Sequence, residues 1–413
     1  MGTDEHPPRR LLELLRHEAW VPVAGAAYVA VQAALASQRG GELRYYDERD
    51  YLAIARSLRA GEGFALHGGP TAFRPPGQPL FVALVQSVGG ASMVALVVAQ
   101  AMLLAACAVW LARVARPVLG RPEHANLVGL WLLAHPGLAY ATGTAYPVAL
   151  GTASLTAGLL LAARALDTRS SRSALGAGLT LGVAALTTPY FLPLVPGVAL
   201  LAAWRRSYRV ALLVALVGLA PSAAWVARNA AVLGAPTIGT HGGYNLALGA
   251  DDRATPRSGN AFEPLPPRET LPDAELERDA ARRQSALRWI AAHPTRWLGL
   301  AAARSLATLD STGKPSAAGA PRGAASFVAG LGLSAIAVLG LMGLWLERRR
   351  DLAKLTAAAF CCVALSAALS IVKPRFRFPV DPMLGVFALV ALTRAHTAYV
   401  QWRARRLGAT RVD

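Results

Sequence analysis

Two adjacent carboxylates, Asp47 and Glu48, are the first residues in this sequence whose types and spacing could do chemistry. They directly precede segment 50–59, in which apolar residues recur at helical spacing. Such a pair can supply a general base with an orienting partner, or two ligands for a metal ion. The alternative is an acidic N-terminal cap for the helix that follows, which the helix dipole favours. Spacing alone leaves both interpretations open.

Cations in three later segments are suited to binding phosphate. Arg74 is followed by two prolines that stiffen its backbone, and a guanidinium matches phosphate oxygens in a forked geometry. Arg228 stands at the end of an apolar block, and Lys373, Arg375 and Arg377 place three cations within five residues. The alternative for each is an anchor whose charge reaches lipid headgroups. An anionic phosphate and the membrane surface are therefore both candidate partners.

Segment 240–249 is a candidate ligand-binding loop. It contains His241, Gly242, Gly243, Tyr244 and Asn245, and a Gly-Gly turn lets backbone amides approach a ligand closely. A lone histidine in such a loop is more often hydrogen-bonded than metal-bound, and no zinc-ligand spacing occurs. The sequence also lacks a phosphate-binding P-loop, a dinucleotide fingerprint and a nucleophile elbow. Nucleotide chemistry in the cytosol is therefore unsupported.

The elements that must position these residues are membrane helices. Of 413 residues, 54% are hydrophobic and 16% charged, with a mean hydropathy of +0.37, whereas soluble domains carry about a quarter charged residues. This composition excludes disorder, collagen-like repeats and a disulfide scaffold; the three cysteines fall inside apolar blocks. The sequence predicts an all-α, polytopic integral membrane protein with about ten transmembrane helices. The blocks are about 19–37, 91–112, 125–143, 147–163, 174–190, 191–204, 209–226, 323–346, 352–372 and 378–396.

The distribution of the net charge of +18 predicts the orientation of the chain. With the N-terminus in the cytoplasm, every short connection on the inner side is basic, including those at 205–209 and 348–350. Lys and Arg then orient the helices and meet anionic lipid, so no nucleic acid is needed as a partner. The predicted parts are a cytoplasmic N-terminus (1–18), an N-terminal membrane module (19–226) with a first outer loop (38–90), a second outer loop with amphipathic helices (227–322), C-terminal membrane helices (323–396) and a cytoplasmic basic tail (397–413). Within the outer loops we expect helices at 50–59, 273–290 and 295–309 lying on the membrane surface.

Taken in order, these motifs resemble those of the GT-C fold glycosyltransferases that use a polyprenyl-phosphate sugar, the superfamily of lipid A aminoarabinose transferases and protein O-mannosyltransferases. The matching residues are the Asp47-Glu48 pair with Tyr-Leu-x-Ile-Ala, Gly61-x-Gly63-Phe64, Pro70-Thr71-Ala72-x-Arg74-Pro75-Pro76-Gly77, Arg228-Asn229, Gly242-Gly243-Tyr244-Asn245-Leu246 and Arg375-Phe376-Arg377-Phe378-Pro379. The resemblance covers most of the chain.

The resemblance implies an inverting transfer of a hexose or pentose from a polyprenyl-phosphate donor on the extracytoplasmic side. Asp47 would be the base that deprotonates an acceptor hydroxyl or amine, with Glu48 supporting it. The leaving phosphate would be bound by Arg74, Arg228, Arg375 and Arg377. Tyr51, His241, Tyr244 and Asn245 would bind substrate. The expected partners are the lipid donor, a glycan, lipid or protein acceptor, and membrane lipids, and the expected location is a bacterial inner membrane.

The sequence departs from the family pattern at three places. Many relatives carry a Glu after the third span, where this chain reads Thr144-Ala145-Tyr146-Pro147, and many have Arg where it has Thr188. Some place a metal-ligating Glu or His where it has Phe73. The sequence therefore predicts no certain cofactor and gives little support to a divalent metal. Two alternatives to the enzyme are a lipid-linked-sugar flippase and a catalytically inactive assembly protein with the same fold.

Overall fold

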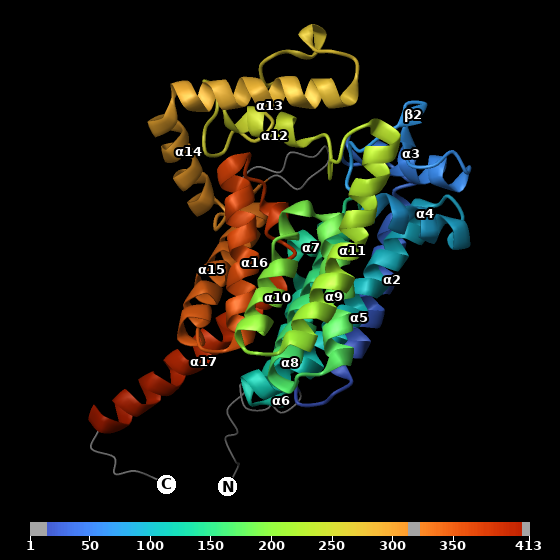
Figure 1. Ribbon diagram of the computed structural model, residues 1–413. Helices are drawn as coiled ribbons and strands as arrows, with labels where there is room; N and C mark the ends of the chain where they lie inside the picture. The colour runs from blue at the N-terminus through green and yellow to red at the C-terminus, as the bar shows by residue number, and fades with distance from the viewer. Residues whose placement is uncertain (1–14, 313–322, 407–413) are drawn as a thin grey trace.

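The computed structural model describes residues 15–312 and 323–406, and within them the chain is almost entirely α-helical. Figure 1 shows a bundle of roughly parallel helices that is capped at one end, with the end of α17 at the opposite end. The all-α expectation is confirmed. The bundle helices are α2 (Trp20–Gln38), α5 (Met93–Leu119), α6 (Pro122–Ala134), α7 (Pro136–Thr142), α8 (Val148–Thr168), α9 (Ser171–Thr187), α10 (Leu194–Trp204), α11 (Tyr208–Leu233), α15 (Ala324–Leu346), α16 (Asp351–Leu369) and α17 (Asp381–Arg406).

Seven of these helices, in the part of the chain that the structure describes, are long and apolar enough to cross a membrane: α2, α5, α8, α11, α15, α16 and α17. The other three predicted blocks are also helical but are shorter or interrupted. Block 125–143 breaks at His135 between α6 and α7, because Pro136 cannot continue the hydrogen bonds of α6. Blocks 174–190 and 191–204 correspond to α9 and to the short turn η1 (Pro189–Phe191) followed by α10.

The last helix is longer than the sequence predicts. α17 runs without a break to Arg406, so most of the segment predicted as a tail, 397–413, continues the helix. Figure 1 shows this end projecting from the bundle. Residues 407–413, like 1–14 of the predicted N-terminal segment and 313–322 of the second outer loop, lie outside the described residues.

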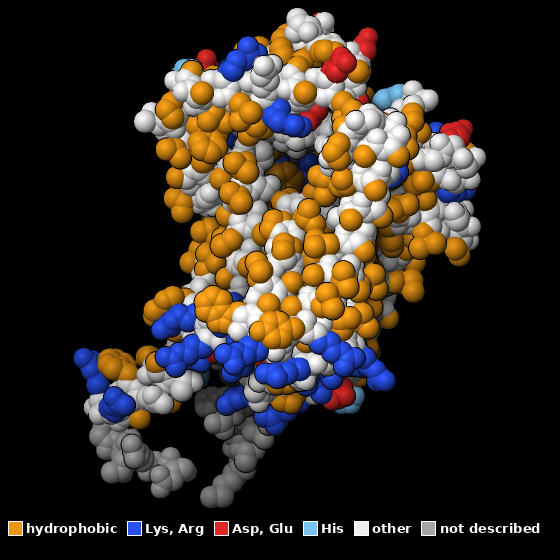
Figure 2. Space-filling view, in the orientation of Figure 1, with side chains coloured by type: hydrophobic (Ala, Val, Ile, Leu, Met, Phe, Trp, Pro, Cys, Tyr) orange, Lys and Arg blue, Asp and Glu red, His pale blue; other side chains and the backbone are white. Residues whose placement is uncertain are grey.

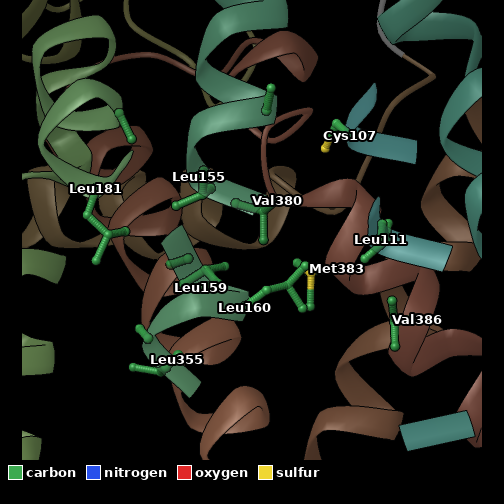
Figure 3. Packing of buried hydrophobic residues seen from close by; sticks show 14 of the residues in the cluster. Cys107, Leu111, Leu155, Leu159, Leu160, Leu181, Leu355, Val380, Met383 and Val386 are labelled. Carbon is green, nitrogen blue, oxygen red and sulfur yellow. The ribbon is translucent and has the colours of Figure 1, made fainter. Parts of the chain in front are cut away.

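The bundle is held together by apolar side chains and by close backbone approach at small residues. Figure 3 shows Leu160 of α8 beside Met383 of α17, in the same buried core as Leu155 and Leu159. Helices α9 and α11 approach so closely that a Cβ on Gly182 would lie 2.9 Å from the backbone oxygen of Gly218. Small residues permit this packing, which is a common way for helices to associate where apolar burial alone gives no preference.

The cap is built from the described parts of the two segments predicted as outer loops, 38–90 and 227–322. The first contains α3 (Glu48–Arg59), a hairpin of β1 (Ala65–Leu66) and β2 (Gly69–Pro70), and α4 (Gly77–Gly89); the second contains α12 (Gly242–Gly249), the turn η2 (Arg268–Thr270), α13 (Glu275–Ala292) and α14 (Pro294–Ala307). The three amphipathic helices predicted at 50–59, 273–290 and 295–309 are α3, α13 and α14. Figure 1 shows α13 lying across the end of the bundle. In Figure 2, Lys and Arg side chains gather at the end of the bundle opposite the cap, and hydrophobic side chains cover the bundle between that end and the cap.

Candidate active site

A cavity of about 720 Å³ lies between the cap and the bundle, where Figure 2 shows the surface hollowed beneath α13. Its wall combines the first outer loop, the segment around α12, α13 and the connection between α16 and α17. Six Lys or Arg residues line it against three Asp residues, so its charge is suited to an anion. Seven of the ten predicted site residues line this cavity: Asp47, Tyr51, Arg74, His241, Tyr244, Asn245 and Arg375.

Asp47 is held at the wall by two donors from distant parts of the chain. Its Oδ1 lies 2.9 Å from Nη2 of Arg74, and its Oδ2 accepts a 2.6 Å hydrogen bond from the hydroxyl of Tyr146. Burial raises the pKa of this carboxyl, but Arg74, the Tyr146 hydroxyl and Arg375 outweigh it, so the pKa lies below its usual value. Asp47 is therefore an ionised, oriented carboxylate at neutral pH.

Arg74 is a buried cation fixed by a second carboxylate. Its Nε and Nη2 donate to Oδ2 of Asp50 at 3.0 and 2.6 Å, and its guanidinium lies over the rings of Tyr51 and Phe73 at 5.4 and 4.8 Å. Burial lowers its pKa, but the charges around it, those of Asp47 and Asp50 included, raise the pKa above the usual range. Arg74 thus orients Asp47 and is itself already paired.

Glu48 does not line the cavity. Its buried carboxylate accepts hydrogen bonds from the backbone amides of Arg44 and Tyr45, both at 2.8 Å, and of Ala145 at 2.7 Å. Glu48 therefore fixes the turn that precedes α3, and it links the first outer loop to the loop after α7. The amides that Glu48 binds lie before α3 and after α7, so Glu48 is a structural link rather than the helix cap considered from sequence, whereas Asp47 faces the cavity.

The connection between α16 and α17 supplies two cations of the site, Arg375 and Lys373. Arg375 lies over the rings of Tyr146 and Tyr45 at 4.4 and 5.1 Å, and Lys373 donates to the amide oxygen of Asn260 at 2.8 Å. Neither forms an ion pair with a carboxylate of the residues described. Burial, with a smaller effect of Arg375, lowers the pKa of Lys373 to about 8. This segment contains the turn η3 (Pro374–Phe376). Two prolines, Pro374 and Pro379, restrict its backbone at the cavity wall.

Arg377, two residues further on, is placed elsewhere. Its side chain is 1% exposed and is bound to Asp381, to the carbonyl oxygens of Thr308, Leu309 and Leu333, and to Ser311. Asp381 also contacts His135 at 3.0 Å, at the break between α6 and α7. All of its donors are directed at protein atoms, so the geometry does not support the phosphate-binding role expected of Arg377.

Arg228 also stands behind the site rather than in it. Its Nη1 donates to the carbonyl oxygen of Thr71 at 2.8 Å and its Nη2 to that of Phe64 at 2.9 Å. These bonds anchor the loop that carries Arg74. Arg228 therefore positions the site, and the structure does not place it for contact with a donor phosphate.

The same loop is also bound by Glu275, at the start of α13. Glu275 accepts hydrogen bonds from the amide of Ala72 and from the hydroxyls of Thr71 and Thr240.

The predicted substrate-binding residues form an aromatic wall. His241 packs edge-on against Phe73 at 4.7 Å and stacks on Tyr244 at 4.9 Å. Burial, reinforced by Arg74, lowers the pKa of His241 to about 3, so its ring is neutral at physiological pH. The amide of Gly243 donates to Asp279 of α13 at 2.5 Å, and a Cβ at Gly243 would collide with Asp279. The Gly-Gly motif thus allows α12 to pack against α13, which places Tyr244 and Asn245 at the cavity.

The carboxylates of the cavity do not fit a divalent metal. Asp47 and Asp50 are both engaged by Arg74, whose charge would oppose a cation. Within 15–312 and 323–406, no three His, Cys, Asp or Glu residues gather as metal ligands. We therefore derive no chemical step through a metal.

Two residues of the site, Asp50 and Tyr146, were missed by sequence reasoning, and a third, Lys373, was named only as part of a basic motif. Asp50 looked like one more acidic residue in the first turn of a helix, yet it holds Arg74. Lys373 was named with Arg375 and Arg377 as a candidate for binding phosphate but was not carried into the set of site residues, and Tyr146 stood only within the stretch 144–147 that departs from the family pattern. The aromatic residue at position 146, in a loop predicted to lie on the same side as Asp47, was the available signal for its proximity.

Comparison with known proteins shows the fold. No protein-family model and no curated protein matches the chain. Among solved structures, ArnT from Cupriavidus metallidurans in the apo state is similar at a TM-score of 0.53 and 18% identity, with 90% of this chain and 60% of ArnT covered. ArnT bound to undecaprenyl phosphate matches at 0.52 and 18%, covering 91% of this chain and 60% of ArnT. The apo oligosaccharyltransferase from Archaeoglobus fulgidus matches at 0.50 and 14%, covering 94% of this chain and 52% of that protein.

The chain therefore has the GT-C fold of polytopic membrane proteins. It spans about 60% of ArnT and about half of the archaeal oligosaccharyltransferase. At these identities the likeness concerns the fold alone.

Proposed function

We propose that this protein is an inverting glycosyltransferase that moves a sugar from a polyprenyl-phosphate donor to an acceptor hydroxyl or amine. The observation that carries the proposal is the shared cavity of Asp47, an ionised carboxylate, and of Arg375 and Lys373, two cations without a carboxylate partner among the described residues. A base and an anion site facing one space are what displacement of a phosphate by an acceptor requires. Undecaprenyl phosphate bound to ArnT, a protein of the same fold, supports the class of donor.

In the proposed reaction, the acceptor oxygen attacks the anomeric carbon as the bond from that carbon to the phosphate oxygen breaks. The acceptor proton passes to Asp47, and the bonding electron pair leaves with the polyprenyl phosphate. Negative charge therefore moves from Asp47 to the phosphate, where Arg375 and Lys373 stabilise it. Arg74, held by Asp50, keeps the Asp47 carboxylate oriented throughout.

We further propose that the cavity faces the extracytoplasmic side of a bacterial inner membrane. The basic end of the molecule, with the described ends of the chain, would then lie in the cytoplasm. The apolar helices would hold the lipid tail of the donor beside the bundle, and the acceptor would reach the cavity beneath α13. In this arrangement the described parts of segments 38–90 and 227–322 lie on the extracytoplasmic side, together with the loop that carries Tyr146 and the connection that carries Lys373 and Arg375.

The test is purified protein in lipid nanodiscs, supplied with polyprenyl-phosphate sugars and candidate acceptors, with released polyprenyl phosphate as the readout. Asp47→Asn keeps the shape of the side chain and removes its basicity, so we expect transfer to fall by about 10²- to 10⁴-fold. Glu42→Gln, an exposed carboxylate of the same loop, is the control and should transfer at the wild-type rate. Equal rates for wild type and Asp47→Asn would exclude Asp47 as the base. Movement of the donor across the membrane without bond cleavage would favour a flippase, and donor binding without either would favour an assembly protein.

A further inference from the structure

Among the described residues, Tyr146 contacts both the proposed base, Asp47, and a cation of the proposed phosphate site, Arg375. It lies between α7 and α8, is 6% exposed, and lines the cavity. Its hydroxyl donates to Oδ2 of Asp47 at 2.6 Å. Its ring lies beneath Arg375, with the guanidinium carbon 4.4 Å from the ring centroid. The same side chain therefore contacts the base and supports a cation of the anion site.

The backbone before Tyr146 is fixed by buried polar side chains. Gln100 donates to the carbonyl oxygens of Thr142 and Thr144 at 2.9 and 2.8 Å, and Gln78 donates to that of Ala145 at 3.0 Å. Glu48 accepts from the amide of Ala145 at 2.7 Å. Buried hydrogen bonds of this kind rigidify the segment that they join. The position of the phenol is thus set before any substrate binds.

The hydrogen bond of Tyr146 completes the orientation of Asp47. Arg74 binds one carboxylate oxygen and Tyr146 the other, so the carboxylate plane is fixed by two donors. Each oxygen keeps a further lone pair for an acceptor proton. Without the phenol, the carboxylate could rotate about its bond to Cβ. A misaligned carboxylate is less often placed to accept the proton of the acceptor group.

We propose that Tyr146 is a positioning residue of the active site, which aims the Asp47 carboxylate through its hydroxyl and supports Arg375 through its ring. This inference rests on the proposed function. Tyr146 keeps its own proton during the reaction; only the acceptor proton moves, and it moves to Asp47. Burial, with the nearby Asp47 charge, raises the pKa of the phenol, which makes it a hydrogen-bond donor rather than an acid.

Tyr146→Phe removes the hydroxyl and retains the ring, so it separates the two roles. We expect kcat to fall by about 10- to 100-fold, the loss typical of one hydrogen bond to a charged group. KM for the polyprenyl-phosphate sugar should stay within about twofold, because Arg375 keeps its aromatic support. The acid limb of the kcat profile should move to higher pH, because Asp47 loses a donor that stabilises its ionised form. Tyr146→Leu, which removes the ring as well, should raise KM in addition.

Tyr28→Phe is the matched control. It also removes a partly buried phenol hydroxyl, one that is 2.8 Å from the hydroxyl of Thr142 and remote from Asp47. A purely structural role for Tyr146 predicts that both Phe variants lower thermal stability and leave the pH profile unchanged. That result, or wild-type kcat in Tyr146→Phe, would overturn the proposal. Failure of the proposed function is a separate outcome, because transfer would then survive Asp47→Asn.

Discussion

The two ends of the cavity satisfy their charges in opposite ways. At one end, Asp47 and Asp50 share the guanidinium of Arg74, and Asp47 has a second donor in Tyr146. At the other end, Lys373 and Arg375 rest on an amide oxygen and on aromatic rings. Partly buried cations without a counter-ion are costly, so an anionic ligand gains most at the second end. The first end orients a base, and the second is open to a phosphate.

Arg375 and Arg377 repeat this contrast within three residues. Arg375 faces the cavity, whereas Arg377 is buried and bound to Asp381, three carbonyl oxygens and a hydroxyl. The turn η3 directs the two side chains to different surroundings. The supply of partners, rather than residue type, decides which arginine is available to a ligand.

The largest effect should come from Arg377→Met, which would leave Asp381 buried without its ion-pair partner. Breaking a buried pair on one side destabilises a protein by about 3–5 kcal/mol, so we expect a large loss of stability, measured by chemical unfolding in detergent. Arg375→Met is the matched variant and should unfold almost like wild type. Equal stability of the two variants would remove the distinction between them.

The next largest effect should be on donor binding. Arg375→Met removes a charged donor from the anion end, and the affinity for undecaprenyl phosphate should fall by about 10- to 100-fold. Arg375→Lys should recover part of it, because the charge returns without the forked geometry. The measurement is titration of the lipid into protein in nanodiscs at two salt concentrations. Unchanged affinity would mean that Arg375 serves lipid anchoring alone.

The fold and the residues that line the cavity could largely be predicted from sequence. Long apolar blocks predict the helices, and basic connections gather at one end of the bundle as their positions suggest. Asp47, Arg74 and Arg375 are far apart in the chain, yet their shared predicted side of the membrane and their resemblance to a family order placed them together. The interruption at His135 and the extension of α17 were not predicted, because the apolar blocks were drawn from composition alone; Pro136 was the available signal for the first, and composition does not report where α17 ends.

Side-chain partners could not be predicted in the same way. Glu48 and Asp47 are adjacent and chemically alike, but α3 directs one toward backbone amides and the other toward the cavity. Arg228 and Arg74 were both predicted to bind the donor phosphate. Only Arg74 reaches Asp47, whereas Arg228 binds a backbone carbonyl oxygen. Such differences depend on the rotation of each helix and on which carbonyl oxygens lie within reach, and a single sequence contains neither.

A smaller effect than the loss of donor affinity in Arg375→Met is expected from pH, at the end of the cavity that holds Lys373 and Arg375. Lys373 is a cation only below its pKa of about 8, so donor affinity should fall as pH rises through that value. Lys373→Arg should keep its charge and remove this alkaline limb, because a guanidinium stays protonated. The loss in wild type should be several-fold, since Arg375 remains charged. A limb that persists in Lys373→Arg would assign the titration to another group.

The smallest expected effect lies in the contact that joins the two outer loops. Glu275 on α13 accepts hydrogen bonds from Ala72 and Thr71 of the first loop and from Thr240. Glu275→Gln replaces one acceptor oxygen by a donor, and the loss of about 1 kcal/mol should raise the KM for donor or acceptor about fivefold with kcat nearly constant. Exposed Glu277 on the same helix supplies the control, Glu277→Gln. A fall in kcat without a change in KM would show that this contact acts on the orientation of Asp47 and Arg74. The end of the cavity that holds these two residues would then depend on the second outer loop as well as on the first.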